Sequence, residues 1–167
     1  METSLRGHAH KYGKNVDTDV IIPGKYCNII DPAELGKHAL EGLDPDYTSK
    51  MKSGDIIVAD TNFGCGSSRE VAPIAIKGSG TAAVIAKSFA RIFYRNALNI
   101  GLPIFESAEA VDGIDNGDEI EVEAASGVIR NLTKGTQYKA AEFPPFMQQL
   151  IDAGGLVPYV ESRLAAK

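Results

Sequence analysis

The sequence predicts an α/β domain in which parallel βαβ units are followed by an antiparallel hairpin. Between residues 55 and 105, short apolar runs alternate with helical segments, which is the order of parallel βαβ units. Residues 117–123 then alternate strictly between polar and apolar, and a second run returns after a turn, as in a hairpin with one wet face. The chain has 167 residues and 44% of them are hydrophobic, so we expect one domain, residues 1–167, with a substantial core.

The first 30 residues carry weaker signals. His8 and His10 lie in a polar stretch that we expect to be solvated, and a metal site there would lack acidic or cysteine support. Residues 19–22 form a short apolar run that ends at Pro23-Gly24, which predicts a strand running into a turn.

A helix is predicted at residues 31–40. Asp31 is suited to the N-cap and Pro32 to the first helical position, and Glu34 completes a capping-box pattern. Before it lies a loop, residues 24–30, whose tyrosine, cysteine and isoleucines have little reason to be exposed.

The βαβ region and the hairpin follow with clearer boundaries. The expected strands are 56–59, 81–86 and 103–105, and the expected helices are 71–77 and 89–98, the second capped by Ser88. The hairpin strands are expected at 117–123 and 128–132, with a third strand at 137–139 and a last helix at 144–153.

Charge and composition exclude several classes of function. The formal net charge is −5 and the 17 basic residues are scattered, so no basic face for nucleic acid is expected. No apolar run reaches the about 18–20 residues of a membrane span, and the first residues lack a signal-peptide core, so we expect a cytoplasmic protein without a membrane partner. The two cysteines, Cys27 and Cys65, cannot hold an iron–sulfur cluster or a structural zinc unaided.

The strongest local signal is the segment 62–70, Asn-Phe-Gly-Cys-Gly-Ser-Ser-Arg-Glu. It joins a predicted strand to a predicted helix through a glycine-rich turn. Two hydroxyls, from Ser67 and Ser68, and the Arg69 guanidinium would lie where a helix presents its free N–H groups. The segment therefore predicts an anion site.

Two other interpretations of this segment explain it less well. A purely structural turn accounts for Gly64, Gly66 and one serine, but it needs neither a second serine nor an arginine. A dinucleotide fingerprint would need glycine where Arg69 stands and an acid near Lys87, and no P-loop pattern is present. A carboxylate ligand suits the segment better, because arginine pairs bidentately with carboxylates.

Three separated motifs carry a family resemblance. The Gly-Ser-Ser-Arg-Glu motif at 66–70, the run at 86–93 and the Asn-Val-Asp-Thr-Asp-Val-Ile-Ile-Pro motif at 15–23 resemble the swivelling domain of the aconitase superfamily. In its short form the chain is similar to the small subunits of the 3-isopropylmalate dehydratase family, from about Gly7 to Tyr159. The resemblance implies an aconitase-type swivelling fold of the β/β/α kind.

The resemblance also implies a chemistry and a partner. Members are hydro-lyases that dehydrate and rehydrate a small hydroxy-dicarboxylate, and a [4Fe-4S] cluster carried by the large subunit acts as Lewis acid on the departing hydroxyl. This chain would bind no cluster and would act only with its large subunit. By position, Ser67 matches the catalytic base, Asp19 matches an active-site aspartate, and Ser68 and Arg69 match residues that grip a substrate carboxylate.

The family's substrate-reading loop corresponds here to Tyr26, Cys27, Asn28 and Ile29. The sequence has no arginine between positions 6 and 69, so a homoaconitate-type substrate with an extra carboxylate is disfavoured. An apolar substituent fits better, as in 3-isopropylmalate and hence leucine biosynthesis, although a dimethylmalate is equally compatible with these residues. The alternative outside enzymology is a stand-alone carboxylate-binding module.

One position departs from the family pattern. Many relatives have histidine after Ser-Ser-Arg-Glu, whereas this chain has Val71. We interpret the change as a tolerated packing difference rather than a sign of a specialised substrate.

Overall fold

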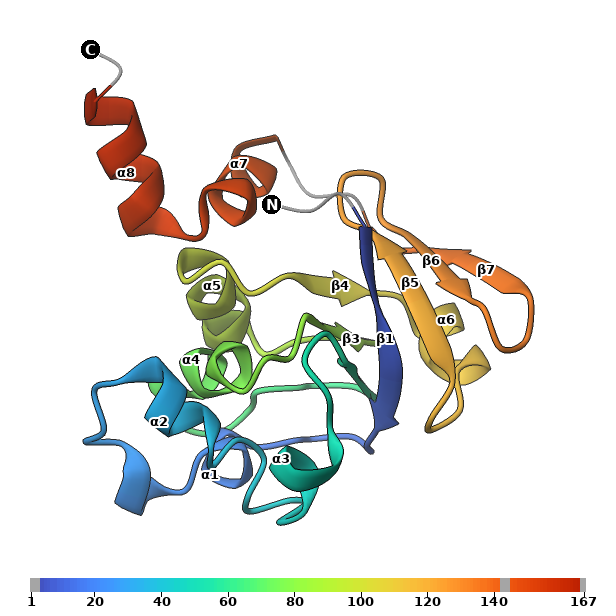
Figure 1. The fold of residues 1–167 in the computed structure, drawn as a ribbon, viewed down its shortest axis with the longest axis horizontal. Helices are drawn as coiled ribbons and strands as arrows, with labels where there is room; N and C mark the ends of the chain where they lie inside the picture. The colour runs from blue at the N-terminus through green and yellow to red at the C-terminus, as the bar shows by residue number, and fades with distance from the viewer. Residues whose placement is uncertain (1–3, 142–144, 166–167) are drawn as a thin grey trace.

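The computed structural model describes residues 4–141 and 145–165. The strands are β1 (Ser4–Lys11), β2 (Ile56–Ala59), β3 (Ala83–Ala86), β4 (Ile104–Glu106), β5 (Glu119–Glu123), β6 (Val128–Asn131) and β7 (Thr136–Lys139) (Figure 1). The helices are α1 (Thr18–Ile21), the 3-10 turn η1 (Gly24–Tyr26), α2 (Pro32–Gly36), α3 (Tyr47–Lys50), α4 (Val71–Gly78), α5 (Arg91–Asn99), α6 (Ala108–Gly113), α7 (Pro145–Ala153) and α8 (Leu156–Ala165).

One sheet joins the two halves of the fold. Its strand order is β4-β3-β2-β1-β5-β6-β7. The four strands from β4 to β1 run parallel, and β5 to β7 continue the sheet in antiparallel fashion. The predicted parallel βαβ units and the antiparallel hairpin with its third strand are therefore confirmed.

The central strand β1 corrects the expectation of a solvated N-terminal segment. β1 pairs in parallel with β2, where Ala9 faces Ile56, and antiparallel with β5, where Gly7 faces Ile120. Its polar sequence concealed it, because the polar side chains find partners far along the chain. Lys11 Nζ, for example, donates hydrogen bonds to the carbonyls of Val111 and Ile114.

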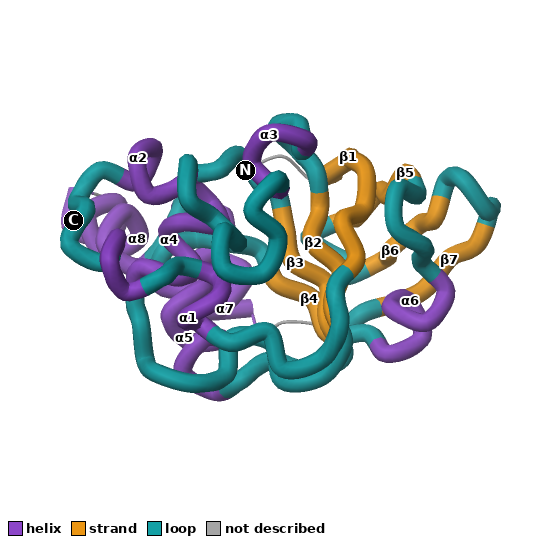
Figure 2. The backbone as a smooth tube through the Cα atoms, turned by 90° about the horizontal axis from the view of Figure 1, so that it is seen from below, coloured by secondary structure: helices purple, strands orange, loops and turns teal. Residues whose placement is uncertain are grey.

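Each face of the parallel part of the sheet packs against a separate hydrophobic core. On β2, Ile57 and Ala59 belong to the cluster under α4 and α5, whereas Ile56 and Val58 belong to the cluster shared with α6 and the hairpin. All four side chains are fully buried, as expected of parallel strands covered on both faces. Figure 2 shows most helices gathered on one side of the strands and α6 beside the hairpin strands.

The run predicted as a strand at 19–22 is instead the single helical turn α1. The Asp17 carboxylate caps this turn by accepting a hydrogen bond from Asp19 N at 2.6 Å, and Ile22 N closes it onto Thr18 O at 2.9 Å. Local capping therefore overrides the β-branched composition on which the strand prediction rested.

The helix predicted at 31–40 stops early. Asp31 caps α2 as expected, accepting from Ala33 N at 3.2 Å, but Glu34 pairs with Lys37 instead of completing a capping box. The chain then turns back toward α1 through Leu40, which is fully buried and has a left-handed φ of 59°. A continued helix could not make this return.

Further differences concern helix boundaries. α5 begins at Arg91, with Ala90 as its N-cap, and the Ser88 hydroxyl accepts a hydrogen bond from Asn62 N at 2.8 Å instead of capping the helix. Helices α3, α6 and α8 were not predicted, and the expected helix start at residue 144 lies outside the described residues. In the described ranges no helix combines the length and hydropathy needed to cross a bilayer.

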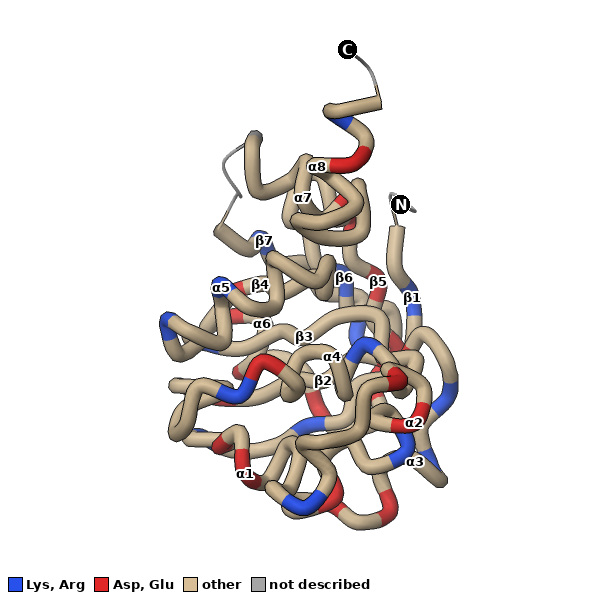
Figure 3. The backbone as a smooth tube through the Cα atoms, turned by 90° about the vertical axis from the view of Figure 1, so that its left-hand side faces the viewer, with Lys and Arg blue, Asp and Glu red and all other residues tan. Residues whose placement is uncertain are grey.

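Charged residues of both signs are interspersed along the backbone. Figure 3 shows Lys and Arg next to Asp and Glu in the lower half of that view, around α1, α2 and α3. Several of them form ion pairs with near neighbours, such as Lys37 with Glu34 and Lys50 with Asp44. This end of the molecule therefore carries mixed rather than single-sign charge.

Candidate active site

The glycine-rich segment forms a tight turn after β2. Gly64 and Gly66 have left-handed φ values of 84° and 89°. A Cβ on Gly66 would lie 2.4 Å from Asp17 Oδ2, and one on Gly64 would lie 2.2 Å from the Phe93 ring. Both positions therefore require glycine for conformation and for close approach.

This turn runs beside the segment that follows β1. Thr18 N donates to Cys65 O at 2.9 Å, and Gly64 N donates to Val16 O at 2.7 Å. Because β1 and β2 are adjacent parallel strands, both segments leave the sheet at the same edge. Ligand sites of open α/β sheets commonly lie at the carboxyl ends of strands.

Thr18 links the two segments through its side chain. It is 2% exposed, and its hydroxyl donates to Ser67 O at 2.8 Å. Thr18 Oγ1 also lies 3.2 Å from Ser67 Oγ. Since each hydroxyl has one proton and that of Thr18 goes to Ser67 O, the Ser67 proton is donated either to Thr18 Oγ1 or to Asp19 Oδ1. Ser67 Oγ also lies 3.5 Å from Asp19 Oδ1.

The Arg69 guanidinium is oriented by two contacts. One nitrogen pairs with Asp19 Oδ1 at 2.7 Å and another donates to Ile22 O at 2.8 Å. The Cα of Gly24 faces the same group, so that a side chain there would begin 3.4 Å from Arg69 Nη2. The structure thus brings together Ser67, Asp19 and Arg69, three of the residues predicted from the sequence.

The serines do not cap helix α4, as the purely structural interpretation of the turn would require. α4 begins at Val71, and Glu70 is its N-cap without a side-chain hydrogen bond. Ser67 turns toward α1 instead, and the exposed Ser68 side chain makes no hydrogen bond within the described part of the chain. Val71, which replaces the family histidine, packs against the core under α4.

The predicted substrate-reading loop is divided between inward and outward side chains. Asn28 is exposed, Tyr26 and Cys27 are half-buried, and Ile29 packs against the core. Ile30 is 93% exposed, which corrects the expectation that this loop hides its apolar side chains. Gly24 is therefore the loop residue that lies next to the Arg69 guanidinium, whereas Ile29 packs into the hydrophobic core.

Comparisons with known proteins identify the family. Residues 45–109 match the family model of the aconitase C-terminal domain. The 3-isopropylmalate dehydratase small subunit of Caldicellulosiruptor saccharolyticus is 63% identical over 160 residues, which cover 96% of this chain and 92% of the relative. The chain belongs to the 3-isopropylmalate dehydratase small-subunit family. The predicted resemblance and the aconitase-type fold are confirmed.

Other members of the small-subunit family agree in fold and length. The crystal structure of a 3-isopropylmalate dehydratase from Methanocaldococcus jannaschii superposes with a TM-score of 0.93 at 47% identity, covering 98% of this chain and 96% of that one. The 2,3-dimethylmalate dehydratase small subunit of Eubacterium barkeri is 60% identical over 157 residues, covering 94% of this chain and 96% of the relative.

Some site residues of this family member were missed by the sequence analysis. Asp17 packs its carboxylate against Gly66, and Thr18 contacts Ser67, although both belong to the motif at 15–23. Their position next to Asp19 in that motif could have indicated that they belong to the site. His38 and Glu41, which contact Tyr26, carried no signal in the sequence.

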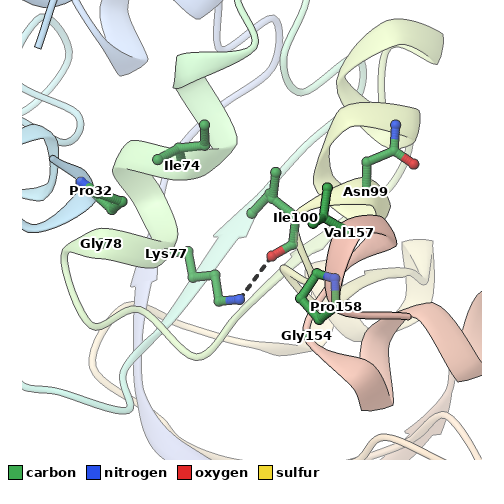
Figure 4. A pocket seen from close by; sticks show the side chains of 9 residues that line it. All are labelled: Pro32, Ile74, Lys77, Gly78, Asn99, Ile100, Gly154, Val157 and Pro158. Atoms are coloured by element: carbon green, nitrogen blue, oxygen red, sulfur yellow. Dashed lines mark hydrogen bonds between the residues drawn. The ribbon is translucent and has the colours of Figure 1, made fainter. Parts of the chain in front are cut away.

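One cavity of this small-subunit fold lies away from these residues. It measures about 510 Å³ and is lined mainly by apolar side chains of α4, α5 and α8, including Ile74, Ile100 and Val157 (Figure 4). Lys77 spans it and donates to Ile100 O at 2.8 Å. Within the described residues, no cluster of three or more His, Cys, Asp or Glu side chains is arranged to hold a metal ion.

Proposed function

We propose that this chain is the small subunit of a 3-isopropylmalate dehydratase, a hydro-lyase that is active only with its large subunit. The observation that carries the proposal is the convergence of Ser67, Asp19 and Arg69 at one sheet edge. The Asp19 side chain is 60% exposed there, so the cluster is open to a second subunit. The relatives are named small subunits, which agrees with a chain that contributes only part of an active site shared between two subunits.

Arg69 is proposed to bind a substrate carboxylate together with Ser68. Its guanidinium is held by Asp19 and the Ile22 carbonyl, so its direction is fixed before the substrate arrives. Fixed orientation of a binding group reduces the entropy that must be lost in the transition state. The exposed Ser68 hydroxyl is free of side-chain partners among the described residues and can turn toward the same carboxylate.

Ser67 is proposed as the base that removes the proton next to that carboxylate. A serine hydroxyl must first lose its own proton, and nearby donors and positive charge favour the resulting anion. Thr18 can rotate its hydroxyl toward Ser67 Oγ, 3.2 Å away, and the Arg69 guanidinium offsets the negative charge of Asp19, whose carboxylate lies beside Ser67 Oγ. Asp19 contacts both side chains and so fixes Ser67 Oγ and the Arg69 guanidinium relative to each other.

The cofactor is proposed to be a [4Fe-4S] cluster carried by the large subunit, which supplies Lewis-acid chemistry at the substrate hydroxyl when bound. The donors of this chain do not suit a cluster, because such clusters need about four ligands, mostly cysteine, and the two cysteines here lie at positions 27 and 65. Burial, and then the Asp17 carboxylate, raise the pKa of the Cys65 thiol, which disfavours the thiolate that a metal requires.

The substrate is proposed to carry an apolar substituent. The loop around Tyr26 offers Cys27 and Asn28 but no arginine for an extra carboxylate. The dimethylmalate enzyme of Eubacterium barkeri is the second candidate, because its small subunit is 60% identical to this chain. We further propose that the protein is cytoplasmic, acts in leucine biosynthesis and works as one swivelling domain, residues 1–167.

The test is a substrate panel on the reconstituted complex. The chain is co-expressed with its large subunit under anaerobic, iron-replete conditions and assayed on 3-isopropylmalate, 2,3-dimethylmalate and homoaconitate. We expect the highest kcat/KM on 3-isopropylmalate. Preference for 2,3-dimethylmalate would reassign the substrate, and turnover of none of the three would favour the carboxylate-binding module.

The proposed base is tested by Ser67→Ala. Because general-base catalysis contributes about 10²–10⁴-fold, kcat should fall by that factor while the complex still assembles in size-exclusion chromatography. Ser126→Ala, in the β5–β6 turn, is the matched control and should retain activity. Full activity of Ser67→Ala would place the base elsewhere.

A further inference from the structure

Three side chains around the predicted substrate-reading loop form a closed cluster, which we call the Tyr26 clamp: Tyr26, His38 and Glu41. The Tyr26 hydroxyl donates to Glu41 Oε1 at 2.7 Å. Glu41 Oε2 lies 2.7 Å from His38 Nδ1. The imidazole of His38 stacks on the Tyr26 ring with centroids 3.7 Å apart and planes 9° from parallel. Each side chain of the clamp therefore contacts the other two.

We propose that His38 and Glu41 are positioning residues that set substrate selectivity by fixing the Tyr26 ring, and with it residues 24–30, beside Arg69. The proposal rests on the proposed function, because it assigns selectivity to the loop of that site. A single carboxylate that serves both a phenol and an imidazole restrains the ring more than either contact alone. Lys25 adds a fourth contact, with Nζ 5.1 Å from the centroid of the same ring.

The segment that carries His38 and Glu41 is itself fixed to helix α1. Leu40 N donates to Ile21 O at 2.7 Å, and Gly42 N donates to Val20 O at 3.0 Å. A Cβ on Gly42 would lie 2.7 Å from Val20 Cα, so the two backbones touch. Because α1 also carries Asp19, the clamp and the proposed catalytic groups share one support.

The loop held by the clamp begins at the guanidinium of Arg69. Arg69 contacts Ile22 O and faces Gly24, and Gly24 accepts the backbone hydrogen bond that closes η1. Tyr26 is two residues further on, so a shift of its ring moves the backbone beside the proposed carboxylate site. A substituent on a substrate held by Arg69 would meet this loop first.

The charge state of Glu41 agrees with this role. The hydrogen bond from Tyr26, and after it the one from His38, lower the pKa of the Glu41 carboxyl below its ordinary value despite the effect of burial. The carboxylate is therefore ionised at neutral pH and accepts from both partners. Glu34, seven residues earlier, pairs with Lys37 at 2.8 Å, and His38 is only the smallest influence on its charge, so it offers a control outside the clamp.

The first experiment measures selectivity in the complex with the large subunit. The variants are Glu41→Ala, Glu41→Gln and the control Glu34→Ala, and the readout is the ratio of kcat/KM for 3-isopropylmalate to that for 2,3-dimethylmalate. This ratio does not depend on the fraction of active enzyme, so a merely structural defect leaves it unchanged. We expect Glu41→Ala to change it at least fivefold, mainly through KM. Glu41→Gln, which keeps one acceptor oxygen, should recover part of the effect, and Glu34→Ala should leave the ratio unchanged.

The second experiment needs no activity. Amide hydrogen exchange of the isolated chain should be at least tenfold faster at Tyr26, Cys27 and Ile29 in Glu41→Ala, because their N–H groups are bonded within the loop. Unchanged amide exchange in Glu41→Ala would overturn the proposed clamp. A kcat/KM ratio in Glu41→Ala equal to that in Glu34→Ala would overturn it as well. A wild-type complex that turns over neither substrate would instead refute the proposed function, and the exchange result would still decide whether the clamp holds the loop.

Discussion

Thr18 is one of the residues whose contacts join the two motifs of the candidate site. It donates its hydroxyl to Ser67 O, 2.8 Å away, and its oxygen lies 3.2 Å from Ser67 Oγ, whose proton goes either to Thr18 or to Asp19. Its own N–H is bonded to Cys65 O. A buried threonine with these partners fixes the backbone of Ser67 and places a hydroxyl beside that of the proposed base.

Replacing Thr18 separates these effects from general packing. Thr18→Val keeps the shape but removes the hydroxyl, whereas Thr18→Ser keeps the hydroxyl. Because a hydrogen bond to a charged group contributes about 1.5–3 kcal/mol, kcat of the complex should fall about 10–100-fold in Thr18→Val. Thr18→Ser should stay within about threefold of wild type if the hydroxyl is what matters. Equal losses in the two variants would show that the methyl group, not the hydroxyl, is needed.

At the scale of elements, the sequence predicted the regular core and missed the connections that build the site. Strand 56–59 and the helix from Val71 agree with the structure, because their apolar patterns reflect burial directly. The strand β1 and the helix α1 did not follow from local pattern. β1 is polar and finds its partners more than 40 residues away, and α1 depends on one capping carboxylate.

The same distinction applies to the predicted site. The residues of contiguous motifs, Ser67, Arg69 and Asp19, could be named from sequence, because short motifs fix local chemistry. The contacts of Tyr26 with His38 and Glu41 could not, since they depend on the left-handed turn at Leu40 that returns the chain to α1. No local pattern predicts that return.

The junction of β1 and β2 depends on Asp55. Its carboxylate accepts hydrogen bonds from the N–H groups of His8 and Lys52, both at 3.0 Å, and lies 2.7 Å from His10 Nε2. Burial raises the pKa of Asp55, but the hydrogen bond from His10 and those from the two backbone groups outweigh it, so the pKa is lowered overall. This carboxylate connects the first strand to the start of the second.

A lowered carboxyl pKa has a defined effect on stability. In the unfolded state the Asp55 carboxyl has its ordinary pKa, about 3.9, whereas in the folded state its pKa is lower. Ionised Asp55 therefore contributes fully to the free energy of unfolding above about pH 4, and this contribution is lost as the pH falls through the folded-state pKa. Asp55→Asn should therefore lower the free energy of unfolding by roughly 1–3 kcal/mol at pH 7, and the deficit should shrink toward pH 2–3. Urea titrations at several pH values measure this. Asp152→Asn, on the exposed face of α7, is the control, and a deficit independent of pH would contradict the account.

At the scale of the whole molecule, one sheet separates two cores that must form together. Ile56 and Ile57 are adjacent in β2 and both fully buried, but they belong to different clusters. Each cluster contains residues from both ends of the described chain: Val16 with Ile151 in one, Ala9 with Ala140 in the other. Neither core can be completed by a contiguous piece of the sequence.

This arrangement predicts one cooperative unfolding transition. Ile56→Ala and Ile57→Ala should each cost about 2–5 kcal/mol, because each leaves a cavity in a packed core. If residues 1–167 form one domain, both variants shift the same single transition in calorimetry, with calorimetric and van't Hoff enthalpies equal. Ile92→Ala, at a position 42% exposed, is the control. Two separate transitions in either variant would show that the halves unfold independently.

The central place of β1 has a consequence for how the chain is made. One of its pairing partners, Glu119–Glu123, is synthesised more than 100 residues after its own eight residues. Contacts of such long sequence separation slow folding, because a long loop must close before they form. During synthesis, the edge of β1 that pairs with β5 therefore stays unpaired until β5 has been made. We expect folding of the nascent chain to be completed only after the hairpin has emerged from the ribosome.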